Sequence, residues 1–120
     1  MRSDSPTPLS REERELLNAL LAHDFVGVQE LREQAGHLLA KRGCDCGCGT
    51  IDFVLDGSSV PRSGAASPVP VEGLVFDEDG VEIGGLILFL EEGTMKSLEV
   101  YSHDEQPLPL PRREQVTWLE

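Results

Sequence analysis

Three cysteines, Cys44, Cys46 and Cys48, lie in the short stretch 44–48 and carry the most distinctive chemistry of this chain. In an extended backbone, residues two apart point to the same side, so the three sulfur atoms could line one edge. Thiolates in that arrangement suit zinc or copper(I). A fourth ligand would have to be His37, His23, His103 or a nearby Asp, and His37 is the first candidate. The spacing therefore permits a transition-metal site.

Two other interpretations of these cysteines stay open. Free cysteine packs like a small hydrophobe, so the three residues can be structural members of a glycine-rich bend. A Cys-x-Cys pair can also open and close as a redox couple, although the carboxylate of Asp45 should disfavour the thiolate. The chain has no second cysteine pair, so the two paired knuckles of many zinc sites are absent. We expect the structural interpretation to hold, with no bound cofactor.

The second chemical signal is charge. The chain of 120 residues has 22 Asp and Glu against 10 Lys and Arg, a net charge of −12. Such a charge repels nucleic-acid phosphate and anionic membranes, so neither is expected as a partner. A basic protein remains a suitable partner, because opposite potentials attract.

The carboxylates are concentrated in the second half of the chain. Between residues 72 and 105 there are ten of them and one cation, Lys96. The turns of a β-meander alternate between its two ends, so two of the acidic turns should meet at one end. We expect a partner-binding surface there, formed by Asp77, Glu78, Asp79, Asp104 and Glu105.

A catalytic arrangement is not visible in the sequence. It contains no phosphate-binding glycine loop and no G-x-S-x-G motif, and no serine or cysteine has an obvious paired base. We therefore predict that the protein is not an enzyme.

Two helices should open the fold. Ser10 followed by Glu13 forms a capping box, and leucines then recur at helical spacing up to Ala22 or His23. Asp24 is the expected cap of a second helix that stops at Gly36.

Strands should follow at 37–42, 50–55, 69–75, 81–90 and 97–102. In the best of them, 81–90, the alternation changes phase at Gly84-Gly85. A bulge there would keep Val81, Ile83, Leu86, Leu88 and Leu90 on the core side. Residues 57–68, rich in Gly, Ser, Ala and Pro, read as an exposed loop whose tip should be mobile.

The predicted fold class is α+β, with two N-terminal helices packed on an antiparallel sheet of about four to five strands. Residues 1–8 should be a disordered lead-in and residues 9–120 a single domain with an extended, Pro-rich C-terminal tail. The strand 86–90 is apolar on both faces. The tail should cover one face, and a partner copy is the alternative, so we expect a monomer or a homodimer.

The longest apolar run, Leu86 to Leu90, is too short to span a membrane. Residues 1–6 lack the apolar region of a secretory signal. We therefore expect a cytoplasmic protein.

Several motifs resemble a group of small, uncharacterised proteins of actinobacterial type. They are the capped Leu-Leu helix, Asp24-Phe25-Val26-Gly27, Cys46-Gly47-Cys48 within a Cys-x-Cys-Gly-Cys stretch, and Gly93 followed by Leu98-Glu99-Val100-Tyr101. Similar Leu-Glu-Val-Tyr hairpins occur in small immunity-like proteins of bacterial toxin systems. The resemblance implies one compact domain and no assigned activity. We expect an acidic, immunity-like binding module for a basic partner, with binding of zinc or copper as the alternative function.

Overall fold

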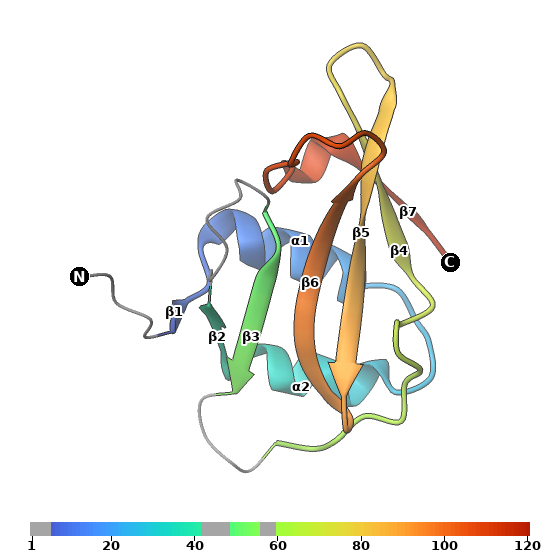
Figure 1. Ribbon diagram of the computed structural model, residues 1–120. Coiled ribbons are helices and arrows are strands. Elements are labelled where there is room, and N and C mark those ends of the chain that lie inside the picture. Colours follow the sequence, from blue (N-terminus) through green and yellow to red (C-terminus); the bar gives the residue numbers. More distant parts are fainter. Residues whose placement is uncertain (1–5, 42–48, 56–59) are drawn as a thin grey trace, which may run out of the picture.

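The computed structural model describes residues 6–41, 49–55 and 60–120. These residues form a seven-stranded antiparallel sheet in the order β1-β2-β3-β6-β5-β4-β7, with two α-helices on one face (Figure 1). The elements are β1 (Thr7–Pro8), α1 (Arg11–Leu21), α2 (Val28–Ala35), β2 (Leu38–Lys41), β3 (Ile51–Leu55), β4 (Glu72–Phe76), β5 (Glu82–Glu91), β6 (Thr94–Ser102), the 3₁₀ turn η1 (Arg113–Gln115) and β7 (Val116–Leu119). None of the described helices has the length and apolar character needed to cross a membrane.

The first helix begins as its sequence predicts. The Ser10 Oγ accepts a hydrogen bond from the Glu13 amide at 3.1 Å, and the Glu13 carboxylate accepts one from the Ser10 amide at 2.8 Å. Leu16, Leu17 and Leu20 of this helix are fully buried. The capping box and the leucine stripe are both confirmed.

The corner between the two helices differs from the prediction. Gly27, in the left-handed region at φ 88°, is the N-cap of α2 in place of Asp24. The Asp24 carboxylate instead accepts a hydrogen bond from Arg32 at 3.1 Å. Arg32 also donates to the Leu21 carbonyl at 2.7 Å, which satisfies one of the free carbonyls at the end of α1. Arg32 therefore fixes the angle at which α2 leaves α1.

The prediction of four to five strands is wrong, because the sheet has seven. The two additional strands lie at its edges: β1 falls in the expected lead-in, and β7 falls in the Pro-rich tail. An edge strand needs one row of hydrogen bonds only, so it can be short and can lie next to proline. A strand of two residues is too short for an alternating pattern to reveal, and the prolines that precede β7 argued against a strand in the tail.

The bulge prediction for β5 is right in part. Relative to β4, the register shifts between the pairs Val75–Gly84 and Phe76–Glu82, so Ile83 is the extra residue. Leu86 and Leu88 are fully buried as expected, but Val81 is 55% exposed. The bulge lies before the glycines and turns the start of the hairpin away from the core.

The tail packs against the core on the helix side of the sheet. Gly73 of β4 pairs with Trp118 of β7, and a Cβ at Gly73 would lie within 3.0 Å of both the Trp118 ring and the Val116 side chain. Leu108 and Leu110 also contact the core cluster. The expectation that these residues cover the second face of 86–90 is therefore wrong.

Residues 60–69 are partly exposed, as expected for the loop 57–68, and are also hydrogen-bonded to the rest of the fold at several points. The buried amide of Gln34 donates to the carbonyls of Pro61 at 2.7 Å and Gly93 at 2.8 Å, and accepts from the Met95 amide at 3.0 Å. Ser67 Oγ accepts from the Leu90 amide at 2.9 Å. Gln34 thus joins α2, this segment and the β5–β6 turn; residues 57–59 lie outside the described residues.

Candidate functional site

The two acidic turns lie at the same end of the sheet. Ser102, the last residue of β6, pairs with Gly84 of β5, and the His103 amide donates to the Ile83 carbonyl at 3.0 Å. The turn after β6 is therefore hydrogen-bonded to the start of β5, at the end of the sheet where the β4–β5 hairpin turns (Figure 1). This end of the molecule, the acidic end, is formed by Asp77, Glu78, Asp79, Asp104 and Glu105.

Two of these carboxylates also shape their own turns. Asp77 Oδ1 accepts hydrogen bonds from the amides of Asp79 at 2.9 Å and Val81 at 3.0 Å. Asp104 Oδ1 accepts from the Gln106 amide at 2.8 Å, and this bond is the main reason that the pKa of Asp104 lies below its usual value. Backbone amides thus hold both carboxylates in place, and the bond from Gln106 also favours the charged form of Asp104.

Two cations that follow the second acidic turn in the sequence, Arg112 and Arg113, lie to one side of the acidic end. The Gln115 side chain donates to the Phe76 carbonyl at 3.2 Å, which brings η1 to the end of β4. Arg112 and Arg113 there line a pocket of about 260 Å³ together with Arg11 and two carboxylates of α1, Glu12 and Glu15. Arg112 and Arg113 therefore lie close to carboxylates of α1.

A tyrosine stands beside the acidic end, on the face of the sheet opposite the helices. Its ring lies over Gly85: a Cβ there would be 2.4 Å from the Tyr101 hydroxyl. The hydroxyl donates to a Glu72 carboxylate oxygen at 3.3 Å, and the ring meets that of His103 edge-on at 5.8 Å between centroids. Partial burial, followed by the charge of Glu72, raises the pKa of Tyr101 above its ordinary value. Because a raised pKa favours the protonated phenol, the Tyr101 hydroxyl remains a hydrogen-bond donor.

This outer face combines apolar and acidic side chains. Cross-strand partners share a face, so Glu72, Ile87 and Glu99 form one row across β4, β5 and β6. Other side chains of the same face are Leu39, Asp52, Val54, Leu74, Phe76, Phe89 and Leu119. None of the apolar ones belongs to the core cluster or packs against it. Sequence reasoning missed this surface, although the two apolar faces of 86–90 were its signal.

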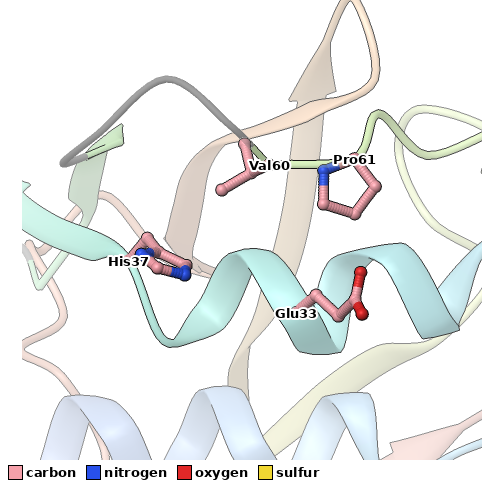
Figure 2. A pocket seen from close by; sticks show the side chains of 4 residues that line it. All are labelled: Glu33, His37, Val60 and Pro61. Atoms are coloured by element: carbon pink, nitrogen blue, oxygen red, sulfur yellow. The ribbon is translucent and has the colours of Figure 1, made fainter.

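The cysteine hypothesis falls outside the described residues, since Cys44, Cys46 and Cys48 all lie in the stretch 42–48. His37 is described. It is exposed after the end of α2 and lines a pocket of about 280 Å³ with Glu33, Val60 and Pro61 (Figure 2). Among the described ranges, no group of three potential ligands could hold a metal ion.

The strand β2 separates His37 from the ends of the cysteine stretch. Leu38, next to His37, pairs with Leu55, whereas Lys41, which leads into the stretch, pairs with Asp52 at the other end of the hairpin. Four residues of strand span about 13 Å. The other two histidines have carboxylate partners: His23 contacts Glu120 at 2.6 Å and His103 contacts Glu82 at 2.5 Å.

We predict that purified protein contains well under one equivalent of zinc or copper, because free cysteine packs well without metal. Elemental analysis of protein prepared without chelators measures this. About one equivalent of either metal, lost on Cys46→Ser but retained on His37→Asn, would contradict the structural interpretation and would also exclude His37 as the fourth ligand.

Comparison with known proteins identifies a family for this chain. No curated protein and no solved structure matches the chain. The sequence motifs led us to expect a family without an assigned activity. That expectation is confirmed by a family model that matches residues 6–111, and the chain belongs to this family, described as Domain of unknown function (DUF6984).

Proposed function

We propose that this protein is a non-catalytic binding module for a basic partner protein, and that the acidic end is where the two first meet. The observation that carries the proposal is the position of the two acidic turns at the same end of the sheet, where His103 after β6 is hydrogen-bonded to Ile83 near the start of β5. It concentrates five carboxylates at one end of a chain of net charge −12. Such a concentration of charge speeds the approach of a basic protein.

The hydrogen bonds in and beside the two acidic turns favour recognition by a folded surface of the partner. Asp77 and Asp104 are fixed by backbone amides, and His103 is held by Glu82. Fixed charges lose little conformational entropy on binding. The likeness of Leu98-Glu99-Val100-Tyr101 to small immunity-like proteins of bacterial toxin systems points to the same class, and the proposal includes a cytoplasmic setting.

Affinity capture tests this proposal. The wild-type chain should retain basic proteins from a cell extract at low salt, and a variant with Asp77→Asn, Asp79→Asn, Asp104→Asn and Glu105→Gln should not. Asparagine keeps the oxygen that accepts the turn hydrogen bonds, so the fold should be unchanged.

A second variant controls for total charge. Glu12→Gln, Glu15→Gln, Glu30→Gln and Glu33→Gln remove four charges from the helices and should leave capture as in the wild type. If both variants and the wild type retain the same proteins, the acidic end has no part in recognition and the proposal fails.

A further inference from the structure

The outer face of the sheet has no cover within the described residues. Both helices lie behind the sheet in Figure 1, and the tail packs on the same side as they do. Apolar side chains that face away from the core extend across the sheet, from Leu39 and Val54 on one side to Leu119 on the other. Val54 is 37% exposed and Leu119 is 45% exposed. An apolar sheet face of this kind marks an interaction surface.

The charges on this face identify the occupant. Carboxylates project from three of its strands: Asp52 on β3, Glu72 on β4 and Glu99 on β6. Lys41 is at its β2 side, and Lys96, at a second bulge, is paired with Glu91 at 3.1 Å. A second copy of a chain of charge −12 would bring like charges together, which is unfavourable. A basic segment would instead pair each carboxylate.

The row Glu72–Ile87–Glu99 gives the spacing of that segment. Neighbouring Cα atoms across a sheet are about 5 Å apart, so the two carboxylates flank the isoleucine at a separation of about 10 Å. An apolar side chain on Ile87 with basic side chains on both sides would fit this row. In an extended chain, residues two apart point to the same face, so a segment with a basic, an apolar and a second basic residue at every second position provides that pattern.

Tyr101 supplies an anchor for one cation. Its ring is fixed over Gly85, its hydroxyl contacts Glu72, and the rest of the half-buried ring faces solvent. A guanidinium can stack on an aromatic ring and pair with a carboxylate at the same time. Tyrosine and arginine are also the side chains that most often dominate binding energy at interfaces.

We propose that the outer sheet face binds an extended, basic and amphipathic segment of the partner protein, with an arginine of that segment held between Tyr101 and Glu72. This inference rests on the proposed function, since it names the contact that follows the first encounter at the acidic end. It assigns to Glu72, Ile87, Glu99 and Tyr101 a binding role distinct from that of the acidic end.

The test uses the full chain, labelled with ¹⁵N, and a synthetic peptide of the repeat Arg-Ser-Val-Ser, in which arginine and valine alternate along one face of the extended chain. A peptide of the same composition, with all arginines in one block, is the control for charge alone. The alternating peptide should shift the amides of the outer-face residues 72–76, 85–89 and 97–101 and should bind about tenfold more tightly than the block peptide.

Two double variants sharpen the result. Glu72→Gln with Glu99→Gln should weaken binding of the alternating peptide about tenfold, whereas Glu30→Gln with Glu33→Gln, the same charge change on the helix α2, should leave it unchanged. Glutamine at residue 72 can still accept the hydrogen bond from Tyr101, so the face keeps its shape.

The contrary outcomes separate the two proposals. Shifts confined to residues 77–79 and 104–105, equal affinity for both peptides, or no binding would overturn the outer-face site, while the capture experiment would still decide the proposed function. Self-association of the free chain that masks the face, detected by sedimentation and abolished by Phe89→Ser, would overturn it as well.

Discussion

Replacing Gln34 by leucine should lower the free energy of unfolding by about 2–5 kcal/mol. The substitution would leave backbone polar groups in the interior without their hydrogen-bond partners. The side chain of Gln34 is completely buried and makes three hydrogen bonds. Leucine would leave the Met95 amide and the Pro61 carbonyl without these partners. The Gly93 carbonyl would keep its bond from the Ser63 amide at 2.8 Å.

Chemical denaturation measures this loss, and Gln29→Leu is the matched control. Gln29 lies on the same helix but is exposed, so the same substitution there should change stability by no more than about 0.5 kcal/mol. Equal effects at the two positions would show that Gln34 does not join α2 to the β5–β6 turn.

Leu88→Ala should cost about 2–5 kcal/mol, the range for a buried leucine whose removal leaves a cavity. Leu88 is fully buried at the centre of β5 and lies opposite Leu98 of β6, which is also fully buried. The same denaturation experiment on Val81→Ala provides the comparison, because Val81 is 55% exposed near the start of the same hairpin. A cost for Leu88→Ala as small as that for Val81→Ala would mean that the bulge at Ile83 does not set the inward face.

Periodic signals in the sequence predicted the interior of the fold. The leucines of α1, its capping box and the alternation around Leu88 and Leu98 are local patterns. In each of them, neighbouring residues favour the same secondary structure. The contacts of Gln34 escaped prediction because its partners are 27, 59 and 61 residues away. A lone glutamine in an amphipathic helix does not reveal that it will be buried.

Of the two candidate surfaces, the acidic end was predicted from the sequence and the outer face was not. The position of the two acidic turns at the same end of the sheet followed from the antiparallel arrangement, in which the chain reverses direction at every turn. The outer face was missed because the tail was expected to cover it. Gly73 has no side chain, and this lets Trp118 and Val116 pack on the helix side instead. The cysteine stretch lies outside the described residues, so its interpretation stays a prediction.

The association rate of the captured partner, measured as a function of salt, tests the proposed function most directly. Electrostatic attraction is screened over about 10 Å at 0.1 M salt, so the rate for the wild type should fall steeply as salt rises. The variant neutralised at Asp77, Asp79, Asp104 and Glu105 should associate more slowly and with a flatter salt dependence. The helix variant, with the same loss of charge, should behave like the wild type. If all three proteins show the same rate and the same flat dependence on salt, the acidic end does not guide a basic partner.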